Sequence, residues 1–114
     1  MKDKRGYLIF LIPPHGSIDV KQQPKQPTLH EMQGWVGGSI QEVPYFTKLT
    51  VDGILYRRGQ AYANEEGFIK GLEPNPRAHE FWKRSCPEGD PKRMHVCGTI
   101  IYVVKEPKTN VTES

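Results

Sequence analysis

Cysteine is scarce in this chain of 114 residues, and no long apolar run occurs. Two cysteines cannot form the disulfide framework of a small secreted domain, so we expect a reducing, cytoplasmic environment. The longest apolar run, Tyr7 to Ile12, is far shorter than the roughly 18 residues of a membrane-spanning helix. It also lacks the cleavage site of a signal peptide. We therefore expect a buried strand there and no membrane segment.

An excess of charge of either sign is also absent. Lys and Arg number 16 against 13 Asp and Glu, which gives a net charge of +3. This value excludes an acidic DNA mimic and falls short of a dedicated nucleic-acid clamp, so we expect no stable nucleic-acid complex. The 36% of hydrophobic residues suffices for one small core. We expect residues 1–104 to form a single domain and residues 105–114 to form a flexible tail.

The first third of the chain predicts a strand, a loop and a helix. Pro13 and Pro14 end the apolar strand, and the segment from Lys21 to Pro27 is polar and rich in proline, which is typical of a surface loop. Thr28 and Glu31 match the S/T-x-x-E capping box of a helix start. The apolar stripe behind this cap consists of Leu29, Met32, Trp35 and Val36, before Gly37-Gly38 ends the helix.

From Ser39 onward the apolar residues alternate with polar ones, which predicts short strands. Asp52-Gly53 is a hairpin dipeptide, and Asn75-Pro76 suits the start of a helix over residues 77–84. The segment from Cys97 to Val104 has the composition of a central strand. This order predicts an α+β domain with a small, mostly antiparallel sheet and one or two helices packed on it.

No motif for catalysis or metal binding is complete. Cys86, Cys97, His79 and His95 could in number form a zinc site, but their spacing matches no zinc motif. No serine lies in a nucleophile elbow, and no third group is in place to orient a thiolate of Cys86. We therefore expect no metal, no cofactor and no enzymatic activity.

Basic pairs stand beside aromatic residues, a composition that suits flat, phosphorylated ligands. In a regular strand, Arg57 and Arg58 would point to opposite faces and could not act on one ligand. The start of the second helix offers another anion site, because its free amides lie near Arg77 and His79. A capped surface helix with a solvated Arg77 is the competing interpretation.

Several short motifs occur in a fixed order between Met32 and Val104. They are V-G-G-x-I at 36–40, N-E-E-G at 64–67, G-L-x-x-N at 71–75 and Gly98 near the start of the last strand. In these motifs the chain resembles a family of small proteins of unknown function found in bacteriophages and other mobile elements. The resemblance implies a phage accessory protein in the host cytoplasm, and phage proteins of this size often counter host defence.

We therefore predict a non-catalytic protein that binds and sequesters a nucleotide-derived immune signal, of the cyclic oligonucleotide or cyclic ADP-ribose type. In this hypothesis, asparagines read a base or ribose edge, the helix start holds phosphate and an aromatic ring stacks on the base. A homo-oligomer would help to bury the ligand. The candidate ligand-binding residues are Asn64, Asn75, Arg77, His79, Phe81 and Trp82.

The alternative is an inhibitor that binds a host defence protein directly. It would use an exposed aromatic patch of Tyr45, Phe46 and Trp82 with arginines at its rim, since aromatic residues and Arg dominate interface hot spots.

Overall fold

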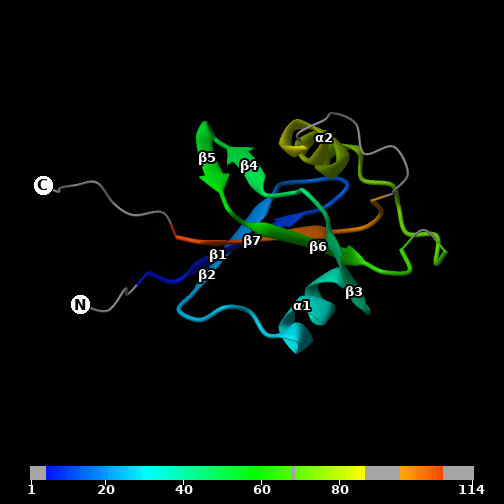
Figure 1. The fold of residues 1–114 in the computed structure, drawn as a ribbon. Helices are drawn as coiled ribbons and strands as arrows, with labels where there is room; N and C mark the ends of the chain where they lie inside the picture. The colour runs from blue at the N-terminus through cyan, green and yellow to red at the C-terminus, as the bar shows by residue number, and fades with distance from the viewer. Residues whose placement is uncertain (1–4, 68, 87–95, 107–114) are drawn as a thin grey trace, which may run out of the picture.

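Nine elements build the part of the chain that the computed structural model describes, which is residues 5–67, 69–86 and 96–106. In chain order (Figure 1) they are β1 (Tyr7–Ile12), β2 (Asp19–Gln23), α1 (Leu29–Val36), β3 (Ile40–Val43), β4 (Lys48–Val51), β5 (Ile54–Arg57), β6 (Gln60–Asn64), α2 (Pro76–Ser85) and β7 (Ile100–Lys105). Neither helix is long and apolar enough to cross a membrane.

Five strands form one antiparallel sheet in the order β2-β1-β7-β6-β3, and β4 pairs with β5 in a separate hairpin. The predicted α+β fold class is confirmed. β7 is the central strand and is buried over its first five residues, as its composition predicted. The strand begins at Ile100 and not at Cys97 as predicted, because Cys97 forms only an isolated bridge to Pro74. It ends at Lys105, a residue that the sequence predicted to lie in the tail.

β2 occupies part of the segment from Lys21 to Pro27, which the sequence predicted to be a loop, and that prediction was wrong for Lys21 to Gln23. These residues pair with β1, from Tyr7 opposite Gln23 to Leu11 opposite Asp19. β2 lies at the edge of the sheet. An edge strand is solvated along one side, so its polar composition resembles that of a loop.

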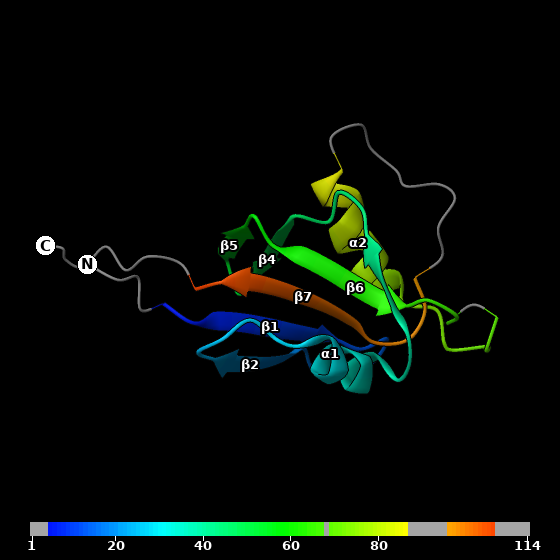
Figure 2. The same cartoon turned by 60° about the horizontal axis from the view of Figure 1, so that its bottom comes forward.

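One helix covers each face of the sheet (Figures 1 and 2). On one face, Ala78 and Trp82 of α2 pack with Phe46, Leu49 and the sheet residues Phe10, Ile12, Val43, Ala61, Ala63, Ile100, Tyr102 and Val104. On the other face, Met32 and Val36 of α1 pack on Ile9, Ile101 and Val103. The alternation of side chains along β1 and β7 supplies both cores.

The capping box of α1 is confirmed. The Thr28 hydroxyl accepts a bond from the Glu31 N–H at 3.1 Å, and the Glu31 carboxylate accepts one from the Thr28 N–H at 2.9 Å. The bond from the Thr28 N–H to the carboxylate, with a further one from the Gln23 side chain, holds the pKa of Glu31 below its ordinary value. Gly37 ends the helix in the left-handed conformation with a φ of 82°. Leu29 is exposed, against the predicted stripe, because the packed part of this short helix starts only at Met32.

Tyr102 joins the hairpin to the sheet from the α2 face. Its hydroxyl donates to the Tyr56 carbonyl at 2.8 Å and accepts from the Gly59 N–H at 3.2 Å. Position 59 requires glycine, because a Cβ there would overlap the Tyr102 ring. Burial raises the pKa of Tyr102 to about 12. The hairpin therefore sits at a fixed place beside the ends of β1 and β7.

Candidate ligand-binding site

Both asparagines of the predicted ligand site are buried, and their amides form hydrogen bonds inside the fold. Asn75 donates to the carbonyls of Ile12 and Gly98, each at 2.8 Å, and its side-chain oxygen caps α2 at the Ala78 N–H at 3.0 Å. Asn64 donates to the Val36 carbonyl at 3.3 Å and accepts from the Glu66 N–H at 2.8 Å. These contacts occupy the groups that would read a base.

The aromatic residues of α2 face the core. Trp82 is 2% exposed, and its Nε1 donates to the Pro44 carbonyl at 2.6 Å. Phe81 is half-buried against the same core. The His79 ring meets Trp82 edge-on, with centroids 6.0 Å apart. In this state the Trp82 ring has no open face on which a base could stack.

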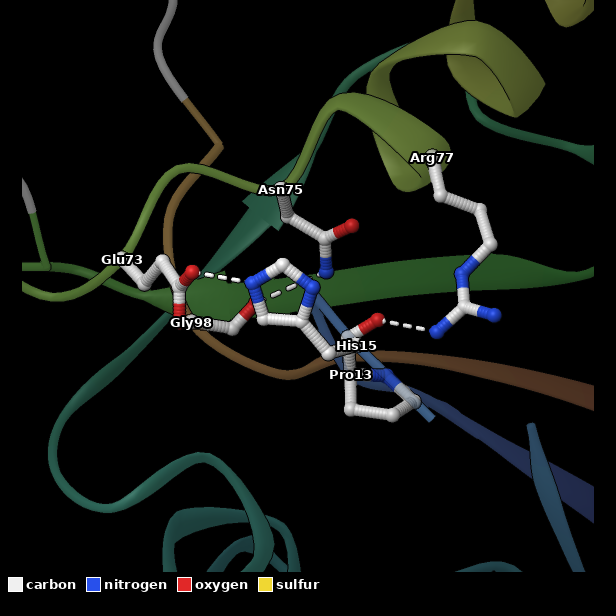
Figure 3. Close-up of polar contacts among 6 residues, drawn as sticks. All are labelled: Pro13, His15, Glu73, Asn75, Arg77 and Gly98. Carbon is white, nitrogen blue, oxygen red and sulfur yellow. Dashed lines mark hydrogen bonds and ion pairs between the residues drawn. The ribbon is translucent and has the colours of Figure 1, made fainter. Parts of the chain in front are cut away.

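Arg77 lies at the start of α2, where two loops converge (Figure 3). Its Nη2 donates to the Pro13 carbonyl, and its Nε is buried with no hydrogen-bond partner among the described residues. Beside it, His15 pairs with Glu73 across the same two loops. The structure thus brings Asn75 and Arg77 together at one end of α2, where both bind loop carbonyls, and places Asn64 near the end of α1.

Of the three aromatic residues in the patch predicted for a protein-binding inhibitor, only Tyr45 is exposed. Phe46 and Trp82 are buried in the core, which corrects their predicted exposure, because apolar ring area at the α2 contact is removed from water there. Tyr45 is 67% exposed and adopts a left-handed φ of 63°. Ser85 holds this turn, since its hydroxyl donates to the Tyr45 carbonyl at 2.7 Å and accepts from the Thr47 N–H at 2.9 Å.

The residues of the considered zinc site are only partly described. Cys97 is buried, and this burial raises the pKa of its thiol. Cys86, at the end of α2, is half-buried, and His95 lies outside the described residues. A thiol with a raised pKa binds metal less readily, because the thiolate is the metal ligand.

A basic groove of about 520 Å³ lies between β5 and the adjoining ends of β1 and β7. The described part of its lining combines four cationic side chains, one carboxylate and three apolar or aromatic side chains. These residues are Arg5, Leu55, Tyr56, Arg57, Arg58, Val104, Lys105 and Glu106. None of the six residues predicted to bind a ligand lines it. The sequence prediction and the groove therefore point to different places on the molecule.

Arg57 and Arg58 line the same groove, although a regular strand would have sent them to opposite faces. β5 ends at Arg57, and Arg58 turns into the left-handed region with a φ of 65°. This conformation is uncommon for a residue with a side chain and cancels the strand alternation. Both side chains are exposed, and neither forms an ion pair with another described residue.

The one carboxylate of the groove has partners of its own. The Glu106 Oε1 accepts from the Gly6 N–H at 2.8 Å, and its Oε2 contacts the Gln22 amide. Arg5 binds the Glu106 backbone carbonyl at 3.2 Å, so its charge is held at the groove wall. Among the residues that the structure describes, four cationic side chains face a single carboxylate in the groove, which gives these residues a positive field.

The edge of β5 adds peptide groups to the groove. Val51 and Ile54 close the hairpin across the two-residue turn Asp52-Gly53, which has positive φ at both positions. In such a hairpin the pair next to the turn exchanges hydrogen bonds, so the peptide groups of Leu55 and Arg57 point away from β4. No described backbone group pairs with them on that side.

Sequence reasoning missed Arg5 and Lys105 because they lie near opposite ends of the chain. They meet only through the pairing of β1 with β7, in which Tyr7 lies opposite Lys105. Two apolar strands of six residues each were the available signal for this pairing. No family model, no curated protein and no solved structure matches the chain, so the resemblance to the phage family stays a prediction.

Proposed function

We propose that this protein binds a phosphorylated nucleotide ligand in the basic groove and performs no reaction on it. The observation that carries the proposal is the convergence of Arg57 and Arg58, both exposed and without ion-pair partners among the described residues, on one cavity. Guanidinium groups bind phosphate oxygens through paired, charge-assisted hydrogen bonds. The groove has the volume of an ordinary small-molecule site, for which about 300–1,000 Å³ is typical.

The rest of the groove suits a nucleoside. Leu55 and Tyr56 supply an apolar and aromatic wall, and the outward peptide groups of Leu55 and Arg57 offer a donor and an acceptor to a base edge. The excess of cations favours a ligand with more than one phosphate charge. This combination supports a dinucleotide or another bisphosphorylated molecule over a simple nucleoside monophosphate.

The biological setting belongs to the same proposal and rests on the sequence resemblance. A phage protein that binds such a ligand tightly would sequester a nucleotide-derived immune signal of the host, of the cyclic oligonucleotide or cyclic ADP-ribose type. Binding alone would suffice for this role, since a sequestered signal no longer reaches its receptor.

The test is thermal denaturation with a panel of mono-, di- and cyclic nucleotides, including cyclic ADP-ribose isomers. A ligand at about a hundred times its Kd adds roughly 2.7 kcal/mol to the free energy of unfolding, which shifts Tm by several degrees in a domain of this size. A flat panel would contradict the proposal and favour the alternative, an inhibitor that binds a host defence protein.

Matched variants then locate the site by calorimetry with the compound that shifts Tm. Arg58→Gln should weaken binding about tenfold or more, whereas Arg84→Gln, which removes an equal charge from α2 outside the groove, should leave affinity unchanged. Arg77→Gln separates the two candidate sites. A loss of affinity in that variant alone would return the ligand to the start of α2.

A further inference from the structure

β2 leaves one edge of the sheet uncovered. It pairs with β1 on one side and with no described strand on the other. Val20 in its middle is 46% exposed, a large value for an apolar residue within a strand. An open edge of this kind presents unpaired peptide N–H and C=O groups and is a template for a further strand.

Two opposite charges flank Val20 on this edge. Asp19 and Lys21 lie opposite Leu11 and Ile9 of β1, so both point to the α1 face, whereas Val20 points to the α2 face. Neither the Asp19 carboxylate nor the Lys21 ammonium forms an ion pair with another described residue. The edge therefore carries an acid, an apolar residue and a base in sequence; Asp19 and Val20 are exposed and Lys21 is half-buried.

We propose that two copies of this chain pair through β2, antiparallel, about a two-fold axis at Val20. In this register Asp19 lies opposite Lys21 of the partner subunit, and Lys21 lies opposite Asp19 of the partner subunit. Residues directly opposite in an antiparallel pair share a face, so both charge pairs form on the α1 side. Val20 meets Val20 of the partner subunit on the α2 side, and the two sheets become one ten-stranded sheet.

A second copy fits this edge because the edge is complementary to itself, as a two-fold interface requires. The other open edges are not. Glu42 is the only charged residue of β3, whereas Lys48 and Arg57 are the only charged residues of β4 and β5. The pairing is independent of the proposed ligand, since no residue of β2 lines the basic groove.

The dimer is expected to be weak. β2 has five residues, and pairing them buries less than the roughly 800 Å² per partner of a stable interface. Self-association should therefore depend on concentration over the range from about 10 μM to 1 mM.

The experiment is sedimentation velocity over that range with charge-reversal variants. Asp19→Lys places lysines opposite each other twice, and Lys21→Asp does the same with aspartates, so each should weaken the dimer about tenfold or more. The double variant Asp19→Lys with Lys21→Asp restores both opposite-charge pairs and should restore wild-type association. Lys25→Asp, an equal charge change in the exposed loop beyond β2, should have no effect.

Circular dichroism of each variant confirms that the chain is folded before its association is compared. A wild-type protein that stays monomeric throughout the range would overturn the inference. A dimer that neither single reversal weakens, or that the double variant does not restore, would also overturn it, because another surface would then hold the two copies.

Discussion

On the α2 face of the sheet, side-chain hydrogen bonds hold the loops in place. On the α1 face, apolar packing and helix caps hold the helix in place. Asn75, Trp82, Ser85 and Tyr102 each donate to a backbone carbonyl in a connecting segment or strand distant in sequence. At the other helix, Asn64 makes one such bond, to the Val36 carbonyl at the end of α1, at 3.3 Å. The remaining support of α1 comes from its local capping box and from the apolar packing of Met32 and Val36 on the sheet.

This difference explains where the candidate groove lies. A ligand site needs side chains held in position by a rigid surrounding. The hairpin that carries Arg57 belongs to the α2 side, where the bonds of Tyr102 fix it against the sheet. The polar residues at the start of α2 serve a structural purpose, and the groove lies at the far end of the same core.

The largest expected effect is on the free energy of unfolding, when each of the two buried asparagines is replaced by alanine. Asn75→Ala removes three hydrogen bonds and leaves the buried Ile12 carbonyl and the partly buried Gly98 carbonyl without this donor, so the free energy of unfolding should fall by about 3–4 kcal/mol. Asn64→Ala removes two bonds, one of them long, and should cost about 1–2 kcal/mol. Urea denaturation measures the loss of unfolding free energy in both variants. Equal losses would contradict the proposed difference between the α2 face and the α1 face.

A second effect concerns pH. The folded pKa of Tyr102 is about 12, above the ordinary value of 10.0, so the folded state holds this proton more tightly than the unfolded chain. The resulting stability is fully present below pH about 10 and is lost as pH rises through about 12, a change of about 2–3 kcal/mol. Urea denaturation at several pH values from 9 to about 12 should show this loss in the wild-type protein and not in Tyr102→Phe.

Tyr62 on the α1 face is the matched control for this pH experiment. Burial and the nearby Glu42 raise its pKa as well, but the residue is only half-buried. Tyr62→Phe should therefore retain most of the wild-type loss of stability at high pH. If Tyr62→Phe removed the loss of stability at high pH and Tyr102→Phe kept it, the loss would have to be assigned to Tyr62 instead of Tyr102.

Local signals in the sequence predicted much of the fold. The apolar run gave the bounds of β1 correctly, the capping box of Thr28 and Glu31 marked the start of α1, and Asn75-Pro76 marked the start of α2. Each signal works within one turn or one strand, because its physical cause is a bond or a steric limit between near neighbours. The part of β2 from Lys21 to Gln23 was missed because an edge strand has no strong apolar pattern.

The residues that the sequence predicted to bind a ligand and the residues that line the groove differ, for a physical reason. An asparagine that binds a buried carbonyl and one that binds a ligand have the same side chain, and only their distant partners differ. Asn75 shows this, since its partners Ile12 and Gly98 lie far from it in the chain. From the sequence, joint binding by Arg57 and Arg58 was excluded because side chains alternate along a regular strand. The left-handed φ of Arg58 cancels this alternation, and one dihedral angle thus kept the groove from being predicted.

The smallest expected effect comes from glycine substitutions, which test whether the strained backbone at Arg58 is needed for ligand binding in the groove. Arg58 and Tyr45 have nearly the same left-handed φ, 65° and 63°, and both lie on the α2 side. Replacing either by glycine relieves a strain of about 1–2 kcal/mol and adds about 0.5–1 kcal/mol of unfolded-state entropy, so stability should rise by up to about 1 kcal/mol in both variants.

Affinity should separate the two. Calorimetry with the nucleotide that shifts Tm should show binding weakened about tenfold or more in Arg58→Gly and unchanged in Tyr45→Gly, because only Arg58 lines the groove. A rise in stability joined to a loss of binding would mean that Arg58 keeps a strained backbone because the groove needs its guanidinium there. Equal affinities in the two variants would instead make the turn at Arg58 a purely structural connection between β5 and β6.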